Sequence, residues 1–569
     1  AEPIEIYDFV YENGNWLPNE PNGNEAQNSS IYIDDDNFSI NNELIFGELH
    51  IPEFATVNVE STLTVIDKMN IKGELIFESN ENQIGQIGEL SSGVEINGEV
   101  TVERYIPEKR SFRFVTSGVN STESIFENWQ ENGESPNGFG THITGSTEGN
   151  NGFDNTETGN PSMFGFENST QNWYSVADTD QTNLEAGKPY RLYIRGDRNI
   201  DLNSNVSESS TVLRAKGSLE TGDKIFDNLG ENAGDFNLIG NPYQAIVDLN
   251  EVNFNNLNTN FVWVWDPNMN ENGAYVVVDI SDGSSTGSSL ANEFLQPGQS
   301  VFFETLNDGA ASLTFTENSK NVNQINNEVF SEIDLAKIDI QLFEIEHLGD
   351  YSTEIDALRI NFNANANNEV DFNDAKKLSN PGENLARLNN NDFLSLENRS
   401  IPTSETELDL AIYNFQNENY TLTLEIENFE THNVFLNDRY TGEAIILNDE
   451  INHFSFDVNP NIPESSAMDR FYLKLENTTL SIKDENFETG FTVYPNPVIN
   501  DQFTIQSKIK HLDSAGVKLY NLYGQVVFSV KSNFSSDRIQ IQTEKFASGI
   551  YFVEIEHENH SFKKKIIVE

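Results

Sequence analysis

The sequence predicts an all-β protein made of several domains. Short alternating runs rich in Val, Ile, Phe, Tyr and Thr recur along the whole chain and are bounded by Asn, Gly, Asp and Pro, the pattern of strands and tight turns. Helical periodicity is nearly absent, and the only candidates are a couple of turns at 124–130 and 373–378. The 569 residues exceed what one hydrophobic core holds together, at about 100 to 200 residues per domain. In order, we expect an N-terminal segment (1–29), a short β-solenoid (30–103), a large β-sandwich or jelly roll (104–325), a second β-sandwich (326–478), a linker (479–490) and a separate C-terminal module (491–569).

The solenoid prediction rests on an internal repeat. Residues 45–51, 71–77 and 96–102 share the pattern Ile-x-Gly-Glu-apolar-x-apolar and follow one another at nearly equal intervals. Between them, apolar-x-apolar pairs recur every six residues, at Val57/Val59, Leu63/Val65, Met69/Ile71 and Leu75/Phe77. This spacing lets each short strand turn a corner and stack on the strand below, so that neighbouring coils bury side chains that one coil alone exposes. An antiparallel meander with a chance similarity is the alternative.

Longer strand patterns joined by long loops follow from Arg104 onward and indicate the two sandwiches. The clearest lie at 112–116, 187–194, 235–239, 261–265, 274–278 and 300–303 for the first, and at 335–343, 357–362, 407–413, 421–426 and 470–475 for the second. The alternation Phe261/Trp263/Trp265 places three rings on one face of a strand, which marks the buried side. The Gly-, Asn- and Thr-rich loop 133–161 is long enough to be either a binding loop or a disordered one.

Charge divides the chain in two. Thirty-three Lys and Arg against 92 Asp and Glu give a net charge of −59; residues 491–569 carry +1, and residues 1–490, termed the passenger, carry −60. A surface of this charge repels phosphate backbones, so nucleic-acid binding is excluded for the passenger as a whole. The same surface repels anionic lipid and attracts cations. Its self-repulsion is screened in a saline medium, where the Debye length is about 8 Å or less.

Three further absences narrow the class of protein. The chain has no cysteine, which excludes disulfides, thiolate nucleophiles and Cys-ligated zinc. No run approaches the roughly 18 apolar residues of a membrane-spanning helix, so no membrane span is expected. The chain starts at Ala1 without a charged-then-apolar leader, as expected if a signal peptide has been removed.

Four short motifs follow one another in the C-terminal module. They are Tyr494-Pro495-Asn496-Pro497, then Tyr523-Gly524-Gln525, then a strand with Gly549 and Tyr551, and last a basic strand with Lys563, Lys564 and Lys565. In this order and spacing they resemble the C-terminal sorting domain of type IX secretion. The resemblance covers residues 491–569 only.

The resemblance implies a fold, a route and partners for this module. The fold is an Ig-like β-sandwich of about seven strands, and the partners are the type IX secretion translocon and its outer-membrane shuttle. The destination is extracellular or the cell surface, after passage through the periplasm, and in this family the tail is usually cleaved at the surface. The family's terminal strand is part of what the export machinery reads. A solvated edge strand whose charge discourages aggregation is the plainer account of Lys563 to Lys565, and the two roles are compatible.

Calcium is the one cofactor for which the sequence offers a candidate site. Hard cations take about six to eight oxygen ligands from carboxylates, amides and carbonyls. Glu369, Asp371 and Asp374 supply carboxylates within one polar segment. A solvated loop or a cap is the alternative, because Asp and Asn favour caps and turns. Clusters of Asp and Asn also occur at 34–37 and 266–273, the latter better explained by a hairpin turn.

No catalytic motif lies in a context that supports it. Residues 283–287 match Gly-x-Ser-x-Gly but form a Gly/Ser loop rather than the required strand–turn–helix. His557 and His560 lack the helical spacing of a zinc pair and lie between two expected strands, as in a hairpin loop. With 92 carboxylates, a glycosidase pair cannot be singled out from sequence. We therefore expect no catalytic residues and no enzyme activity.

The expected function is that of a secreted or surface-displayed adhesion or structural protein, which self-associates or binds a glycan or receptor. The alternative is an extracellular carbohydrate-binding protein with Trp173 or Tyr275 exposed in a groove, since aromatic rings stack on sugars. An enzyme acting on extracellular polysaccharide is a further alternative.

Overall fold

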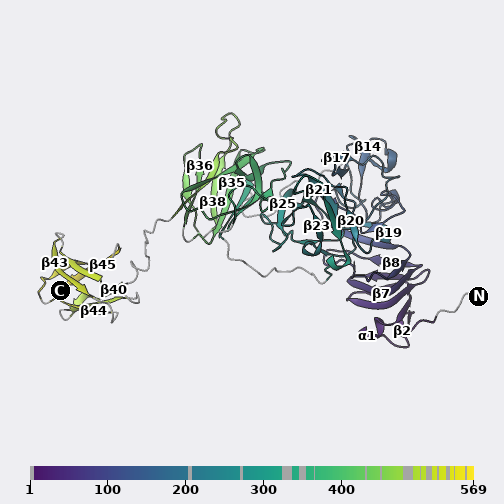
Figure 1. Ribbon diagram of the computed structural model, residues 1–569, viewed down its shortest axis with the longest axis horizontal. Coiled ribbons are helices and arrows are strands. Elements are labelled where there is room, and N and C mark those ends of the chain that lie inside the picture. Colours follow the sequence, from purple (N-terminus) through teal and green to yellow (C-terminus); the bar gives the residue numbers. More distant parts are fainter. Residues whose placement is uncertain are drawn as a thin grey trace, which may run out of the picture. The chain divides into compact units, whose positions relative to one another are not determined.

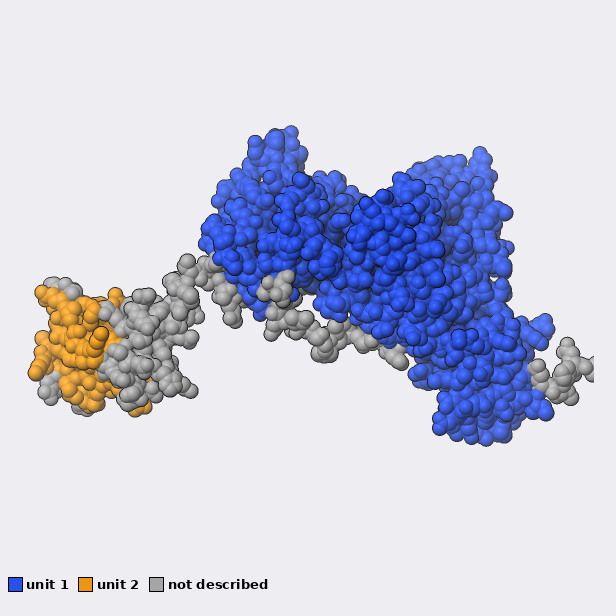
Figure 2. Space-filling view, in the orientation of Figure 1, with its two compact units in different colours: residues 1–477 blue, residues 478–569 orange. Residues whose placement is uncertain are grey.

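The chain divides into two compact units, Ala1–Asn477 and Thr478–Glu569 (Figures 1 and 2). The computed structural model describes residues 6–202, 208–269, 273–322, 336–344, 354–363, 366–429, 432–448, 451–477, 491–499, 502–507, 515–521, 525–532, 538–543, 545–557 and 560–568. The expected linker 479–490 lies outside the described residues. Nearly every described element is a strand, so the all-β prediction is confirmed. None of the helices in the described ranges is long and apolar enough to cross a membrane.

The N-terminal part is a stack of parallel strands, labelled β7 and β8 in Figure 1. One sheet contains, in spatial order, β10 (Glu95–Asn97), β7 (Thr62–Ile71), β5 (Leu44–Ile51), β3 (Ser30–Asp34), β1 (Phe9–Glu12) and β2 (Asn15–Leu17), with β9 (Gln86–Ile87) beside β7. The other contains β13 (Val119–Asn120), β19 (Thr211–Leu219), β11 (Val100–Ile106), β8 (Glu74–Phe77), β6 (Thr56–Val59) and β4 (Phe38–Ile40), and the helix α1 (Gly23–Ala26) precedes β3. Pairing is parallel from β1 to β10 and from β4 to β11, which excludes the antiparallel meander. The eight apolar residues of the six-residue pattern are all buried.

The coils of this stack differ in length. Val57 pairs with Leu75 in the next coil, and Phe77 pairs with Val102 in the coil after that, which is further along the chain. The second and third sequence repeats therefore occupy the same corner of successive coils. The first repeat lies within the single strand β5, so its spacing from the second repeat does not correspond to one coil.

Close packing at the shared corner leaves room for no residue other than glycine. A Cβ atom on Gly73 would lie 2.3 Å from the carbonyl oxygen of Ala55, and one on Gly98 would lie 2.3 Å from that of Ile71. Each corner therefore sits directly against the backbone of the coil below, where only glycine fits.

Antiparallel strands cover one end of each sheet in the stack. β2 folds back antiparallel to β1. At the opposite end, β19 runs antiparallel along the whole of β11, with Thr211 paired to Ile106, and β13 then pairs with β19. Strand β11 also crosses the expected boundary between residues 103 and 104.

Two four-stranded sheets in the middle of the first unit enclose a layer of aromatic side chains. Their strands are β12 (Ser111–Val115), β18 (Tyr190–Ile194), β16 (Met163–Glu167) and β17 (Asn172–Ser175) in one, and β21 (Phe236–Gly240), β27 (Ser300–Glu304), β24 (Phe261–Asp266) and β25 (Ala274–Asp279) in the other. Smaller sheets are formed by β20 (Lys224–Phe226), β28 (Ser312–Phe315) and β23 (Asn253–Asn255), by β22 (Val247–Asp248) with β26 (Phe294–Leu295), and by β14 (Thr144–Ser146) with β15 (Asp154–Asn155). Short 3-10 turns are η1 (Glu131–Gly133), η2 (Asn150–Gly152), η3 (Leu249–Glu251) and η4 (Glu317–Ser319).

Strand β24 is buried on both of its faces. Phe261, Trp263 and Trp265 point into the aromatic layer and are all at most 6% exposed, which confirms that this alternation marks a buried face. Val262 and Val264 point the other way, into a second apolar core. A strand that is buried on both faces has a continuous run of apolar residues in its sequence, as β24 does.

The two short helices expected from the sequence are not helices in the structure. Residues 124–130 form turns, and 373–378 contain the strand β31 (Ala375–Lys376). The second difference arises because Ala375 pairs with Leu396 on a neighbouring strand, and such a long-range partner overrides a weak local preference.

The described strands between residues 336 and 477 form one large sheet that curls around its own core. Its strands, in spatial order, are β37 (Ala444–Ile446), β36 (His432–Asp438), β39 (Phe471–Asn477), β34 (Thr406–Tyr413), β32 (Asn384–Asn389), β33 (Asp392–Arg399), β30 (Glu354–Phe362), β29 (Ala336–Glu344), β35 (Asn419–Glu427) and β38 (Asn452–Asp457), with β31 beside β33. The rings of Phe456 on β38 and Phe471 on β39 lie 4.7 Å apart, so distant parts of the sheet face each other across one core.

The C-terminal unit contains seven described strands. In spatial order they are β43 (Val526–Ser532), β42 (Ala515–Tyr520), β45 (Gly549–His557), β46 (His560–Val568), β40 (Phe491–Ile499), β41 (Gln502–Ser507) and β44 (Arg538–Gln542). Its core includes Phe503, Val517, Leu519 and Val553, all fully buried, and is separate from the cores of the first unit. The unit therefore has what a domain needs to fold as its own body.

Candidate functional site

The candidate calcium residues use their carboxylates within the chain. Asp374, 4% exposed, accepts hydrogen bonds from the backbone N–H of Asp371 (2.9 Å) and of Asn398 (2.8 Å). Asp371 in turn accepts from the N–H and side chain of Asn373, and Glu369 is exposed. Burial, opposed by those two N–H donors, raises the pKa of Asp374 to about 7. Among the described residues, no group of three or more His, Asp and Glu is arranged to hold a metal ion. The calcium hypothesis stays a prediction.

A second buried carboxylate joins the Gly/Ser loop to strand β30. Glu354 is 0% exposed and accepts from Gln341 Nε2 at 2.6 Å and from the Ser288 N–H at 3.2 Å. Burial, partly offset by Ser288 and reinforced by nearby Asp356, raises its pKa to about 7. The Gly-x-Ser-x-Gly residues are held in the same loop, where the Ser285 hydroxyl donates to the Ser289 carbonyl at 2.7 Å. This serine is anchored in a loop rather than placed on a strand-to-helix turn.

The histidine pair of the C-terminal unit occupies a hairpin. The backbones of His557 and His560 pair at the end of β45 and β46, and the two residues between them lie outside the described residues. A hairpin is what the sequence favoured over a zinc site.

The long loop 133–161 is described throughout, and the contacts of Asp154 hold it in place. The Asp154 carboxylate is 2.9 Å from Arg198 Nη2, 3.1 Å from His142 Nδ1 and 3.0 Å from the backbone N–H of Ile143. Burial opposes ionisation, but the hydrogen bonds from His142 and Arg198 outweigh it and lower the pKa of Asp154 to about 2. An open hollow of about 400 Å³ is formed between this loop and residues 175–177 and is lined mainly by Gly, Ser, Asn and Ala, together with the buried Phe153.

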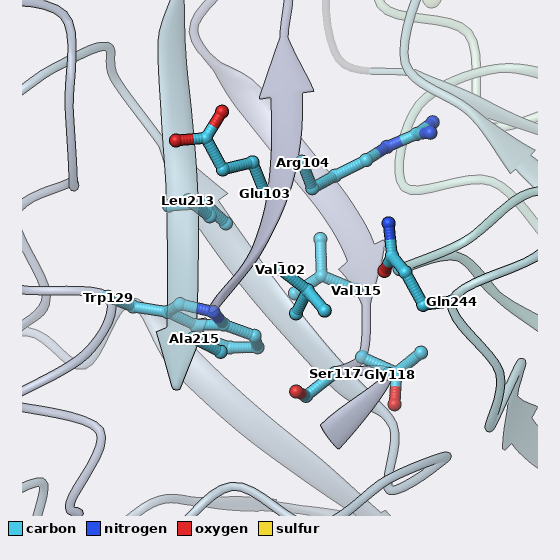
Figure 3. A pocket seen from close by; sticks show the side chains of 12 residues that line it. Val102, Glu103, Arg104, Val115, Ser117, Gly118, Trp129, Leu213, Ala215 and Gln244 are labelled. Carbon is cyan, nitrogen blue, oxygen red and sulfur yellow. The ribbon is translucent and has the colours of Figure 1, made fainter. Parts of the chain in front are cut away.

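A small, largely enclosed cavity lies where β11, β12 and β19 meet (Figure 3). Its volume is about 10 Å³, enough for one water molecule and too small for a substrate. In Figure 3, Trp129 and Val102 line it while the side chains of Glu103 and Arg104 point away to opposite sides. Burial raises the pKa of Glu103 to about 7, although the Ser79 N–H donates to it.

Trp173 and Tyr275, the rings expected in a groove if the chain binds sugars, are part of the aromatic layer. Each is half-buried, and the Trp173 and Tyr275 rings lie 5.7 and 5.9 Å from that of Phe114. The neighbouring Tyr174 is the more exposed residue, at 45%. These two rings thus contribute to the packing of the two sheets.

In the C-terminal unit, Asn496 joins the Pro-rich entry to the final strand. Its Nδ2 donates to the Lys565 carbonyl at 2.8 Å, and its Oδ1 accepts from the Ile567 N–H at 2.9 Å. Directly beyond, Val498 pairs in parallel with Val568. The first and last of the four sequence motifs are therefore joined in space, and one amide side chain replaces a step of the sheet ladder.

The remaining motif residues lie around this junction or support it. The Tyr494 hydroxyl donates to Gln506 at 3.1 Å, and the Tyr551 hydroxyl donates to the Ala547 carbonyl at 2.8 Å. Pro495 is half-buried, Pro497 and Gln525 are exposed, and Gly549 begins β45 by pairing with Val568. Tyr523 and Gly524 lie outside the described residues.

All three lysines of the final strand are exposed. Lys563 is 2.9 Å from Glu554 on the neighbouring strand, whereas Lys564 and Lys565 pair with Val553 and Phe552 through their backbones. The final strand thus presents three positive charges next to β45.

Residues 492–569 match the family model described as a secretion system C-terminal sorting domain. The C-terminal unit is a type IX sorting domain. It indicates export by type IX secretion to the cell surface or the medium. The match leaves the passenger unassigned.

Other comparisons add little beyond the sorting domain. No curated protein matches the chain. Among solved structures, dimeric latent PorU from Porphyromonas gingivalis is 14% identical over 46% of this chain and 31% of its own length, with a TM-score of 0.12. A biofilm-associated protein BSP domain is 9% identical over 82% of this chain and 92% of its own, with a TM-score of 0.13. Similarities this low carry no argument about fold or function.

Sequence reasoning named the sorting residues but missed their partners. Gln506 and Glu554, which contact Tyr494 and Lys563, belong to no motif and are found only through strand pairing. In the passenger it missed a clustering of basic residues that the printed sequence does show. Residues 104–113 and 188–198 contain eight of the 33 Lys and Arg but only two of the 92 Asp and Glu.

Proposed function

We propose that this chain is a non-catalytic adhesion or structural protein, exported by type IX secretion and then displayed on or released from the cell surface. The observation that carries the proposal is a sorting domain with its own core, attached to a passenger of net charge −60. The translocon and outer-membrane shuttle would engage residues 491–569, and a glycan, a receptor or a second copy would engage the passenger.

Layered packing in the passenger supports a structural role over a catalytic one. Its strands stack around continuous apolar and aromatic cores, and the buried carboxylates with raised pKa values hold loops in place through their hydrogen bonds. Rigid, cation-attracting layers of this kind suit a protein that works in a saline, divalent-rich medium.

Removal of the sorting domain tests the export half of the proposal. A chain ending at Gly490 is expected to accumulate in the periplasm, while the full chain reaches the outside. Equal amounts of the two outside the cell would contradict it.

Sedimentation of the passenger tests the other half. Assemblies that form with millimolar calcium and dissolve with chelator would support a structural surface role, with screening of the −60 charge as the switch. A monomer under both conditions would contradict assembly and favour a binder of glycan or receptor.

A further inference from the structure

Five half-buried side chains form one surface on the sheet of β12, β18 and β16, which we name the arginine–aromatic face. Its members are Phe112, Phe164, Arg191, Tyr193 and Arg195. They share one side of the sheet because Phe112 pairs with Tyr193 and Phe164 pairs with Arg191, and because residues two apart on a strand point the same way. This is the side that also carries Phe114 and Phe166 of the aromatic layer, so the five residues border that layer.

The side chains of this face contact one another in sequence. The guanidinium of Arg191 lies 3.9 Å from the centre of the Phe112 ring, the Phe112 and Tyr193 rings are 5.0 Å apart, and the guanidinium of Arg195 lies 4.8 Å from the Tyr193 ring. The Phe164 ring is 6.1 Å from that of Phe112. Two cations thus flank two contacting rings in a single row.

Neither arginine has a hydrogen-bond acceptor among the described residues. Within the same ranges no carboxylate lies within ion-pair distance of either, and the Nε of Arg191 and one terminal nitrogen of Arg195 are buried without a partner. Paired arginines are common elsewhere in the same unit: Arg198, Arg359 and Arg470 each contact a carboxylate at 2.7 to 2.9 Å.

The missing partners are informative because acids are in large excess. The 92 Asp and Glu greatly outnumber the 33 Lys and Arg, and a half-buried guanidinium without a carboxylate partner loses hydration without compensation. Burial lowers the pKa of both Arg191 and Arg195, which reflects that loss. A guanidinium fork matches the planar oxygens of a carboxylate or sulfate group.

We propose that the arginine–aromatic face binds an anionic sugar, with Arg191 and Arg195 on its carboxylate or sulfate group and the rings of Phe112 and Tyr193 against the apolar side of its pyranose ring. The rings favour a sugar over a bare anion, because an inorganic anion has no apolar surface to cover them. Residues 104–113 and 188–198 carry more positive than negative charge, although Arg198 and Lys188 are paired with Asp154 and Glu185. Salt screens the repulsion from the rest of the passenger beyond about 8 Å.

This inference assigns a class of ligand to the proposed adhesion role, and it rests on that proposed function. The two are separable, because export and assembly are measured by the location of the truncated chain and by sedimentation, neither of which involves this face.

The test measures the binding of defined oligosaccharides to the full chain, both by calorimetry and by tryptophan fluorescence. The Trp173 and Trp265 rings lie 5.4 and 5.9 Å from the Arg191 guanidinium, so fluorescence reports on the face directly. The probes are oligogalacturonate for a carboxylate, sulfated dextran oligomers for a sulfate, neutral dextran oligomers of the same length, and acetate.

The principal variant is Arg195→Gln, and Arg191→Lys keeps the charge but removes the fork. The matched control is Arg439→Gln, which also removes an arginine stacked on a tyrosine (4.3 Å from the Tyr472 ring) but one that is paired with Asp409. Both test variants are expected to weaken binding of an anionic oligosaccharide by about tenfold or more, while the control changes it by less than about twofold. Unchanged unfolding midpoints show that the variants fold.

Four results would overturn the proposal. They are equal binding by Arg195→Gln and the unaltered chain, equal affinity for neutral dextran, binding of acetate as tight as that of oligogalacturonate, and loss of self-association in the variants without any sugar binding. The last would assign the face to a carboxylate of a second copy. Preference between the carboxylate and sulfate probes identifies the group recognised.

Discussion

Replacing Glu354 by Gln should stabilise the passenger at alkaline pH. Glu354 is fully buried, and its pKa is about 7 in the folded chain against 4.5 in an unfolded one. A folded pKa above the unfolded value gives stability that is fully present below about pH 4.5 and is lost as the pH rises through about 7. A difference of about 2.5 in pKa corresponds to about 3 kcal/mol of unfolding free energy.

Glutamine keeps the shape of the protonated acid and an oxygen for the Ser288 N–H, but it does not titrate. We therefore expect Glu354→Gln to match the unaltered chain at pH 4.5 and to exceed it by up to about 3 kcal/mol at pH 8. The assay is urea unfolding at a series of pH values, with hydrogen exchange of the Ser288 amide as a local readout. Glu369→Gln, at an exposed position, is the control.

The reasoning fails if Glu354→Gln and the unaltered chain show the same pH dependence, since the burial of Glu354 would then have no energetic consequence. A gain that is equal at pH 4.5 and pH 8 would also refute it, because such a gain would come from packing rather than from ionisation.

Three other outcomes are expected. Asn496→Asp places an oxygen against the carbonyl of the final strand, and should cost the sorting domain about 1 to 3 kcal/mol and reduce the exported fraction, as seen by fractionating cells; undiminished export would show that this junction is not needed. Asp154→Ala leaves a buried arginine unpaired, so protease should cut loop 133–161 faster, with a loss of about 3 to 5 kcal/mol; in the unaltered chain the contribution of Asp154 is present above pH 3.8 and lost as the pH falls towards 2. If Glu369, Asp371 and Asp374 bind calcium, millimolar calcium should raise the unfolding midpoint relative to chelator, and identical midpoints would rule the site out.

Local sequence patterns correctly predicted which side chains are buried, because the burial of a side chain follows strand periodicity. The burial of Phe261, Trp263 and Trp265 followed from alternation alone, and the six-residue pattern marked the inward side chains of the stack. The sorting domain was found because four short motifs follow one another in a characteristic order and spacing. For the strands, the information sits within a few residues of the structure that it determines.

What could not be predicted depends on partners far away in sequence. Arg198 and Asp154 are 44 residues apart, and the strand that covers β11 returns from residue 211. Coil length could not be predicted for the same reason, because the register between strands is set by packing at corners such as Gly73 rather than by the spacing of similar letters. The arginine–aromatic face could be predicted only in part from the sequence. Its basic residues are concentrated in two short segments, but whether Arg191 and Arg195 find a partner depends on residues far away in the sequence.

The reversed strands at the ends of the parallel stack also limit how copies of this protein can join. A second stack could continue the parallel pairing only by adding a strand in the same direction, and at the ends that they cover β2 on one sheet and β19 on the other run against that direction. Backbone templating from coil to coil, the route by which exposed sheet edges propagate into fibres, therefore meets a mismatch at these positions. Contacts between copies at these two covered ends would therefore be made through side chains, which salt and ligands can regulate.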